Sequence, residues 1–442
     1  MLFSSIHFFL FFALFLICIL SFSKYQRNVI IIFSFFFYSY WNFYFIPIIV
    51  FFCISTFYLI RKNYPLLISI SILIFPLIFF KYSTFLIEAF NVDFLLKYSY
   101  KGELPLAISF LTFTAIAVLI DRKNKINNEY NFFNISEYLL FFPQLIAGPI
   151  LRLNQLAPQL NNKILFLKEN IKFGIILFSI GYIKKVYFAD NIGIYIDPYF
   201  QDPSLTDSKD LLKAFLLFPI QIYFDFSGYI DMALGVSKVL GINLPQNFNK
   251  PYFACSISDF WRRWHITLSS WFKDYLYIPL GGSKVVSYKI YLNLLVTMCV
   301  AGLWHGANFN FILWGFLNGL ILSAERYFKI EKFNYSFVKN LFYCFIIFNL
   351  WIVFRISDFS SMLIFFDKLY SNFTDIILFE NLAVLFFVCI CVIFQRYDNY
   401  NVLQSLSQKI NFKILIPFFV TIILVGFSIS LGQSQKFIYF QF

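Results

Sequence analysis

Two of the three histidines in this chain stand in its densest polar clusters. His265 ends the segment 260–265, which also holds two tryptophans and two arginines, and His305 lies within the segment 302–308. An imidazole is the side chain best suited to proton transfer near neutral pH. A titratable ring is costly to bury in hydrocarbon, so in an apolar chain these rings are candidates for function. The third, His7, lies near the start of the first apolar run and is interpreted as incidental.

The composition indicates an integral membrane protein. The 442 residues are 60% hydrophobic and 13% charged, and the mean hydropathy is +0.73. This balance excludes a soluble globular domain. The net charge of +12 does not require nucleic acid as a partner, because lysines and arginines in short loops on one side of a bilayer give the same total. A cationic inner face would also suit an anionic donor that carries phosphates.

About twelve apolar stretches approach the roughly 20 residues that a helix needs to cross hydrocarbon. They are residues 2–22, 29–41, 43–60, 64–80, 103–120, 171–189, 211–237, 287–304, 308–325, 338–356, 380–395 and 413–430. Lys24 and Arg27 follow the first stretch and no lysine or arginine precedes it, which predicts an uncleaved span that begins outside. Most later loop cations then fall inside and the acidic segment 201–207 falls outside. The pattern predicts about eleven or twelve crossings with both termini outside, although the lysines between 81 and 101 fall on the wrong side.

The segment 258–276 predicts an amphipathic helix at the cytoplasmic interface. Its apolar face carries Trp261, Trp264, His265, Leu268 and Phe272. Arg262, Arg263 and Lys273 lie on the other faces, toward water and toward donor phosphates. The segment 277–284 ends the helix with two glycines that allow a tight turn. The alternative is an interfacial anchor in which the arginines are ordinary inside charges and His265 is a packed, hydrogen-bonded residue.

Other polar residues in apolar surroundings extend the candidate site. His305 precedes Gly306, whose small size would leave room for a substrate beside the ring; a structural histidine is the alternative. Asp225 and Asp231 lie in an apolar run, so they are expected either to face a cavity or to pair with a cation such as Arg262. The two histidines lie about forty residues apart without carboxylates in a ligand pattern, and the seven cysteines mostly lie in apolar runs, so no metal site is expected.

The segment 142–149 packs two prolines and a glycine into an apolar stretch. Irregular backbone at membrane depth is tolerated only where protein or a water-filled cavity surrounds it. We therefore expect a re-entrant turn that lines a cavity.

These motifs, taken in order, resemble the membrane-bound O-acyltransferase (MBOAT) family. The resemblance rests on residues 258–271 followed by 302–306, with further similarity at 142–149 and 225–229. Residues 277–282 look like a turn found in the branch of alginate and peptidoglycan O-acetylases. The D-alanyl transferases of teichoic acid lack this turn. The resemblance is strong between about 140 and 320 and looser elsewhere.

The resemblance implies an all-α, polytopic membrane fold of one domain (1–442), in which re-entrant and interfacial helices help to form a funnel with a transmembrane tunnel. It implies His305 as the catalytic histidine and His265 as the second functional one. The residues expected to line the tunnel or bind the donor are Trp261, Arg262, Arg263, Trp264, Lys273, Trp304 and Asn308. The tail 431–442 resembles a C-terminal signature in which a tyrosine, here Tyr439, receives the acyl group; an aromatic tail resting at the interface is the alternative.

The expected function is O-acetylation of an extracytoplasmic polysaccharide by a protein of the bacterial inner membrane. Acetyl-CoA is the expected donor substrate and no cofactor is expected to stay bound. Partners would be membrane lipid, a periplasmic SGNH-type transferase and a glycan acceptor, with no nucleic acid. The alternatives are a D-alanyl transferase of the same family and a transporter or flippase of lipid-linked sugar. The final acceptor stays open between alginate, peptidoglycan and other surface glycans.

Overall fold

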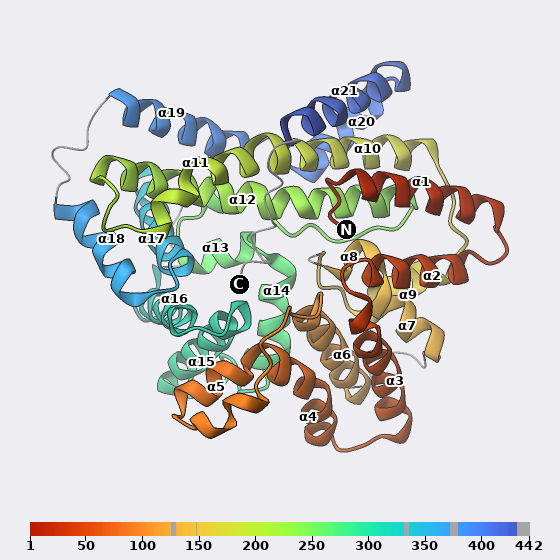
Figure 1. The fold of residues 1–442 in the computed structure, drawn as a ribbon, viewed down its shortest axis with the longest axis horizontal. Helices are drawn as coiled ribbons and strands as arrows, with labels where there is room; N and C mark the ends of the chain where they lie inside the picture. The colour runs from red at the N-terminus through yellow and green to blue at the C-terminus, as the bar shows by residue number, and fades with distance from the viewer. Residues whose placement is uncertain (125–129, 147, 331–335, 372–378, 431–442) are drawn as a thin grey trace. The chain divides into compact units, whose positions relative to one another are not determined.

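The computed structural model describes residues 1–124, 130–146, 148–330, 336–371 and 379–430. Its regular elements in these ranges are helices (Figure 1). The chain divides into two compact units, one of Met1–Phe178 with Met232–Pro245 and one of Ser179–Asp231 with Gln246–Phe442. The helices α10 (Lys168–Tyr182) and α12 (Ser208–Val239) contribute residues to both units. Each unit is therefore described by itself.

The first unit is a helical bundle with a phenylalanine-rich interior. Its remaining helices are α1 (Ile6–Ser21), α2 (Gln26–Ser39), α3 (Ile46–Lys62), α4 (Leu66–Leu77), α5 (Ser83–Ala89), α6 (Ile108–Lys123), α7 (Phe132–Leu140), α8 (Phe142–Leu145) and α9 (Leu153–Asn161). Phe142 packs with its ring centroid 5.3 Å from those of Phe11 and Phe15. Arg27 donates two hydrogen bonds to the buried carboxylate of Glu137, at 2.7 and 2.6 Å. This bidentate pair ties α2 to α7.

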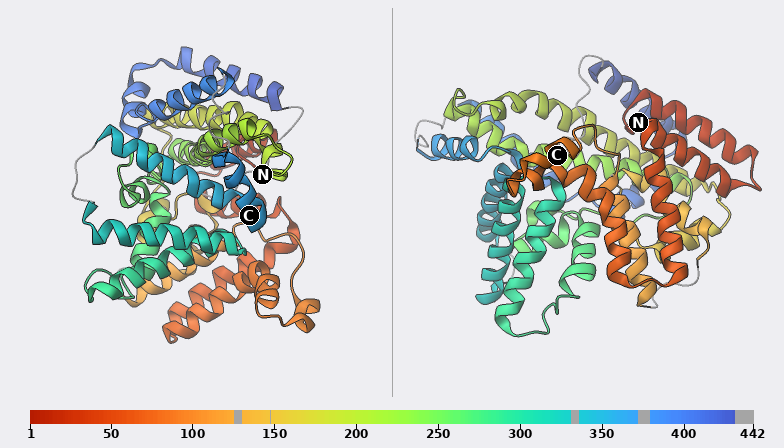
Figure 2. Two further views of the ribbon diagram at one scale, coloured as in Figure 1. Left: turned by 90° about the vertical axis from the view of Figure 1, so that its left-hand side faces the viewer. Right: turned by 60° about the horizontal axis from the view of Figure 1, so that its bottom comes forward.

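The second unit holds both candidate histidines. Its remaining helices are α11 (Asp190–Gln201), α13 (Ile257–Arg263), α14 (Ile266–Phe272), α15 (Ser287–His305), α16 (Phe309–Tyr327), α17 (Phe337–Arg355), α18 (Phe359–Ser371), α19 (Phe379–Phe394), α20 (Tyr400–Lys409) and α21 (Phe412–Ser430). A π-helical turn, η4 (Ile183–Ala189), joins α10 to α11. Figure 2 shows α15, α16 and α17 lying together in this unit.

The predicted apolar stretches coincide with helices. Among the described residues, five helices are long and apolar enough to cross a membrane: Phe43–Lys62, Leu66–Ala89, Ser208–Val239, Phe337–Arg355 and Phe412–Ser430. Ile6–Ser21 and Asn381–Phe394 are shorter apolar helices. The prediction of an all-α, polytopic membrane protein is confirmed. The number of crossings and the orientation of the termini stay predictions.

Glycines hold α15 and α16 at close range. A Cβ atom on Gly302 would lie 2.0 Å from the carbonyl oxygen of Phe311, and one on Gly315 would lie 2.2 Å from that of Met298. No side chain fits at such distances, so the two backbones touch directly. Small residues of this kind let membrane helices approach closely. The close contact fixes the end of α15, where His305 stands.

The prediction of one continuous helix over 258–276 is wrong. The segment forms α13 and α14, separated at Trp264 and His265, and then a π-helical turn, Lys273–Tyr277. His265 has a φ of 43°, in the left-handed region that side chains rarely adopt. The break is stabilised from outside the segment: Asn247 accepts the backbone N–H groups of Ile266, on its carbonyl oxygen, and Thr267, on its side chain. These bonds replace those of a continuous helix.

The tight turn predicted after this segment is confirmed. Gly281 and Gly282 have φ values of 104° and 53°, which glycine adopts without steric cost. Asn293 of α15 donates a hydrogen bond of 3.1 Å to the carbonyl oxygen of Leu280. The turn is therefore fastened to the helix that ends at His305.

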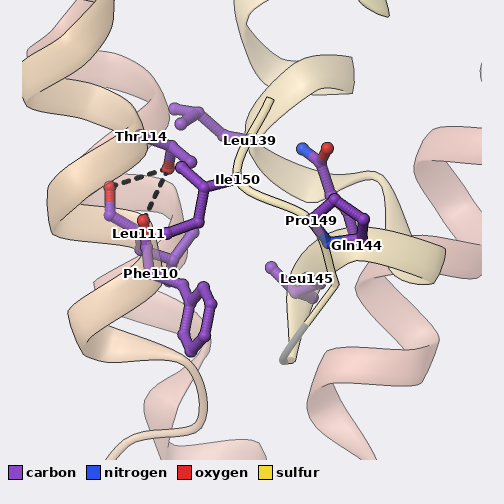
Figure 3. Close-up of a pocket in the computed structure, with 8 residues that line it drawn as sticks. All are labelled: Phe110, Leu111, Thr114, Leu139, Gln144, Leu145, Pro149 and Ile150. Carbon is purple, nitrogen blue, oxygen red and sulfur yellow. Dashed lines mark hydrogen bonds between the residues drawn. The ribbon is translucent and has the colours of Figure 1, made fainter. Parts of the chain in front are cut away.

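The segment 142–149 forms a short buried helix and a turn in the first unit. Figure 3 shows Gln144, Leu145 and Pro149 of this segment across a small cavity from Phe110, Leu111 and Thr114 of α6. The cavity volume is about 10 Å³, which is room for one water molecule. The segment therefore lines a cavity as expected, but one of the size of a water molecule. Residue 147 lies outside the described residues.

Candidate active site

His305 is held in a cage of aromatic rings. Its ring centroid lies 4.9 Å from that of Trp304, 5.4 Å from Trp314 and 5.0 Å from Phe354. The side chain is buried, with 7% of the residue exposed. These rings come from α15, α16 and α17, so three helices determine where the imidazole lies.

The space beside Gly306 is not left for a substrate. A Cβ atom at Gly306 would lie 2.2 Å from a ring carbon of Phe311. The prediction that this glycine leaves room for a substrate is therefore wrong. Its small size instead lets the Phe311 ring pack beside the histidine, at a centroid distance of 6.5 Å.

His265 is buried on a different support. Its Nδ1 atom lies 3.4 Å from the side-chain oxygen of Asn247, and its ring stacks edge-on to Phe226 with a centroid distance of 4.7 Å. Among the described residues no hydrogen-bond partner is found for its Nε2 atom. Burial lowers the pKa of the His265 ring to about 3, because the charged form is poorly solvated there. The ring is therefore neutral at physiological pH.

The rings of both histidines lie near the ring of one tryptophan. The ring centroid of Trp304 lies 6.3 Å from that of His265 and 4.9 Å from that of His305. Segments that are forty residues apart in the chain thus share one aromatic wall. An unpartnered, buried ring nitrogen is costly unless it serves a purpose. The arrangement brings both candidate rings to the same aromatic cluster of the second unit.

A substitution at His265 separates a functional from a packing role. We expect His265→Asn to lower turnover by about 10²-fold, as a misplaced reacting group does. Asparagine tolerates the left-handed backbone but offers no ring nitrogen, so the protein should still fold. Turnover and the unfolding temperature in detergent are the measurements. Unchanged turnover in a folded variant would reduce His265 to a packing residue.

The tryptophans of the first motif form walls of the same aromatic cage. Trp264 is 1% exposed and its ring centroid lies 4.8 Å from that of Trp351. Trp261 packs against Trp314 at 5.6 Å and donates its indole N–H to Asn318 at 3.1 Å. Both therefore reach the cage around His305 by way of the α16 and α17 rings.

The cations of this motif lie nearer the solvent. Arg262 and Lys273 are exposed, and Arg262 donates to the hydroxyl of Ser258 at 3.2 Å. Arg263 forms an ion pair with Asp259 at 2.8 Å. Asn308 caps α16, because its side chain accepts the backbone N–H of Asn310 at 2.8 Å. Arg262 and Lys273 thus lie at the surface and Asn308 caps α16, and the predicted roles of all three in donor binding or in lining the tunnel stay predictions.

The two buried acids pair with lysines instead of the arginine that the sequence suggested. Lys185 forms ion pairs with Asp225 and with Asp190, the latter at 2.8 Å. The other pairs of this cluster are Lys184 with Asp231 at 2.6 Å and Lys184 with Asp398 at 2.5 Å. Lys184 and Lys185 were missed because they lie in a stretch that reads as a plain span. The sequence does contain a signal for this cluster, because charged residues inside an apolar stretch require partners of opposite charge.

The π-helical turn η4 brings these lysines against α12. A Cβ atom on Gly228 would lie 2.7 Å from the carbonyl oxygen of Gly181 and 3.1 Å from the backbone nitrogen of Lys185. The motif that contains Asp225 and Gly228 therefore packs against η4 and forms ion pairs with it, and a role of its acids in a cavity stays a prediction. Among the described residues, the motif also includes Phe226, whose ring packs against that of His265.

Comparison with known proteins decides the family. The model of the membrane-bound O-acyltransferase family, MBOAT, matches residues 88–365, a range that contains both histidine motifs. The chain belongs to the membrane-bound O-acyltransferase family. The resemblance read from the motifs is confirmed, and the protein is an O-acyltransferase.

MBOAT relatives of three kinds are similar to this chain, two of them over most of its length. A peptidoglycan O-acetyltransferase of Helicobacter pylori is 38% identical over 75% of this chain and 71% of its own length. A probable alginate O-acetylase of Pseudomonas putida is 34% identical over 80% of this chain and 77% of its own length. A teichoic acid D-alanyltransferase of Bacillus subtilis is 31% identical over 52% of this chain and 60% of its own length.

Tyr439 and the rest of the segment 431–442 lie outside the described residues. The prediction that this tyrosine receives the acyl group therefore stays a prediction for this MBOAT protein.

Proposed function

We propose that this protein transfers an acetyl group from cytoplasmic acetyl-CoA toward an extracytoplasmic polysaccharide, with His305 as the general base. The observation that carries the proposal is the meeting of His265 and His305 on the ring of Trp304. The relatives named as O-acetylases of peptidoglycan and alginate support an acetyl donor and a glycan as the final acceptor. We place the protein in the bacterial inner membrane, with both termini outside.

The chemistry requires one proton to move twice. Neutral His305 accepts the proton of an acceptor hydroxyl as that oxygen attacks the thioester carbonyl. The tetrahedral intermediate then collapses, the carbon–sulfur bond breaks, and the imidazolium returns the proton to the CoA thiolate. His265, neutral because of its burial, positions the donor or the acceptor. No acyl-histidine intermediate is required.

The donor is proposed to approach from the side that carries Arg262 and Lys273. Both side chains are exposed, so their charges are available to the phosphates of CoA. The tryptophans around His305 would exclude water, which otherwise competes with the acceptor for the thioester.

Tyr439 is proposed as the first acceptor, which passes the acetyl group to a periplasmic transferase of the SGNH type. We expect Tyr439→Phe to abolish acetylation of the glycan, because the phenol oxygen that would carry the ester is gone. Mass spectrometry of the C-terminal peptide and the ester content of the cell wall are the measurements. Normal glycan acetylation in Tyr439→Phe would remove the relay and leave the His305 chemistry untouched.

One experiment tests the proposed function against its rivals. Purified protein in detergent is given labelled acetyl-CoA with no ion gradient present, and release of CoA is followed. A sugar transporter or flippase would not consume the thioester. A D-alanyl transferase would prefer D-alanyl carrier protein, so competition between the two donors separates the members of the family.

A further inference from the structure

Asn247 contacts both the backbone and the ring of the second histidine motif, although it lies outside that motif. It is fully buried and belongs to the irregular segment that follows α12. Its backbone carbonyl oxygen accepts the N–H of Ile266, and its side-chain oxygen accepts the N–H of Thr267 at 2.9 Å. The same side-chain oxygen lies 3.4 Å from the Nδ1 atom of His265. The proposed transfer chemistry gives Asn247 no part, so this contact has a consequence of its own.

The hydrogen bond from Thr267 determines which atom of the Asn247 amide faces the histidine. A backbone N–H can only donate, so the atom that it contacts is the amide oxygen and not the amide nitrogen. The hydroxyl of Thr267 donates to this oxygen as well, at 3.0 Å. An amide oxygen has no proton to give. In the contact with His265, Nδ1 is therefore the donor and carries the proton.

The position of this proton determines what the other nitrogen of the ring can do. A neutral imidazole has one N–H, so a proton on Nδ1 leaves a lone pair on Nε2. The low pKa of the buried ring keeps it neutral at physiological pH. His265 is 1% exposed, and its Nε2 atom has no hydrogen-bond partner among the described residues. A buried acceptor of this kind calls for an N–H or O–H that the described chain does not supply.

The Asn247 side chain leaves a second polar atom available to a ligand. Its Nδ2 atom is buried and has no hydrogen-bond partner in the same described ranges. The two side chains thus offer one acceptor and one donor, the two kinds of group that an amide requires. The arm of CoA carries an amide that an ethylene link joins to the sulfur atom. Its N–H takes no part in the proposed reaction, whereas the acceptor hydroxyl has a single proton, which goes to His305.

We infer that Asn247 is a positioning residue: it holds His265 in the Nδ1–H tautomer, so that Nε2 accepts a hydrogen bond from the amide N–H of the donor's arm. The inference rests on the proposed function, because it names the substrate group that His265 holds. An arm that is fixed next to its sulfur atom restricts where the thioester carbonyl can lie, and such restriction raises the rate of a reaction. His265 then contributes orientation, and His305 contributes the base.

The tautomer is measured directly in the full chain in detergent. Protein labelled in the ring nitrogens of its three histidines is compared by NMR with His265→Asn, in which the signals of His265 are lost. We expect a protonated Nδ1 and an unprotonated Nε2 for His265 at neutral pH. A proton on Nε2, or a mixture of both tautomers, would overturn the inference. This measurement requires no turnover, so its result does not depend on whether His305 transfers an acyl group.

The bound group is identified with a pair of unreactive ligands. One is the S-methyl thioether of pantetheine, and the other is its counterpart in which an ester oxygen replaces the amide N–H nearest the sulfur atom. Ligand-observed NMR gives the dissociation constant of each for the unmodified protein. We expect the ester to bind about tenfold more weakly, because its binding leaves the buried acceptor unpaired. Equal binding, tighter binding of the ester, or no binding of either ligand speaks against the inference.

Two variants separate the tautomer from packing. Asn247→Leu keeps the branched shape of the side chain but has no oxygen, so it should lose the single tautomer and bind both ligands equally. Thr267→Val is the matched control, because it removes the hydroxyl from the same oxygen while the backbone N–H remains; it should keep the tautomer and the ligand preference. An equal effect of Thr267→Val would reduce the contact to packing and overturn the inference.

The unmodified protein decides the question even where Asn247→Leu does not fold, because the tautomer and the ligand pair are both measured without it. Consumption of acetyl-CoA by the same preparation is scored separately. A protein with the expected tautomer and ligand preference that leaves acetyl-CoA intact would contradict the proposed function alone. A protein that consumes acetyl-CoA but shows neither property would contradict this inference alone.

Discussion

His305→Ala is expected to lower the rate of acetyl transfer by about 10²–10⁴-fold, the usual worth of a general base. The substitution removes the imidazole that packs against the rings of Trp304, Trp314 and Phe354. Release of CoA from acetyl-CoA by purified protein is the measurement. The KM for the donor should change little, because the residues proposed to bind the donor phosphates are Arg262 and Lys273.

His7→Ala provides the control, since His7 is an exposed histidine of α1 and lies far from the motifs in sequence. It should retain full activity. His305→Gln, which keeps a polar side chain of similar length, should be as inactive as His305→Ala if proton transfer is the role. A folded His305→Ala protein with unchanged turnover would contradict the assignment of His305 as the base.

Lys185→Met is expected to destabilise the protein by about 3–5 kcal/mol, because it leaves buried carboxylates without their cation. Lys185 is 2% exposed and pairs with both Asp225 and Asp190. The effect should appear as a lower unfolding temperature in detergent and a lower yield of folded protein. It is a loss of stability and not of chemistry, since the lysine does not touch either histidine motif in the described contacts.

Two further variants separate charge from packing. Lys185→Met combined with Asp225→Asn and Asp190→Asn removes the charges together and should recover most of the lost stability. Lys284→Met changes an exposed lysine of the same unit and should have no measurable effect. If the triple variant were no more stable than Lys185→Met alone, the cluster would not be held together by charge.

The sequence alone was sufficient for the family and the fold class, and it singled out the two histidines whose rings lie near one tryptophan. Apolar stretches of the length of a membrane helix are read directly from hydropathy. The segments around His265 and His305 carry residue types that an apolar chain retains only for a reason. These patterns depend on residues close together in the chain, so they can be recognised without knowledge of the fold.

The break at His265 could not be predicted, because its cause lies about eighteen residues away in the chain. The side chain and the carbonyl oxygen of Asn247 accept the N–H groups that a continuous helix would have used internally. Helical periodicity continues through this point, so the pattern favours one helix. Tertiary hydrogen bonds overrode the local preference.

The partners of the buried acids and the role of Gly306 could not be predicted from the sequence either. Asp225 was expected to pair with an arginine, yet the nearest cation belongs to η4, about forty residues earlier. Gly306 was interpreted as space for a substrate, whereas Phe311 of the next helix fills that space. Which side chain lies opposite a given position is set by the packing of helices, and a single sequence holds no direct record of it.

The ion pair between Arg355 and Asp197 carried no sequence signal either. Arg355 ends an apolar helix and is easily read as an ordinary boundary charge. Asp197 lies more than 150 residues before it, and only the fold brings the two together at 3.0 Å. An ion pair of this kind becomes visible once the helices are packed.

The central claim is that His305 moves an acyl group across the membrane from a donor that never crosses it. Protein in sealed vesicles, with acetyl-CoA labelled in its acetyl group supplied to one face only, tests this claim. We expect CoA to be released on the side of addition and labelled acetyl, as ester or acetate, to appear in the opposite compartment, with both signals lost in His305→Ala. Label confined to the side of addition, or equal transfer by His305→Ala, would contradict the account.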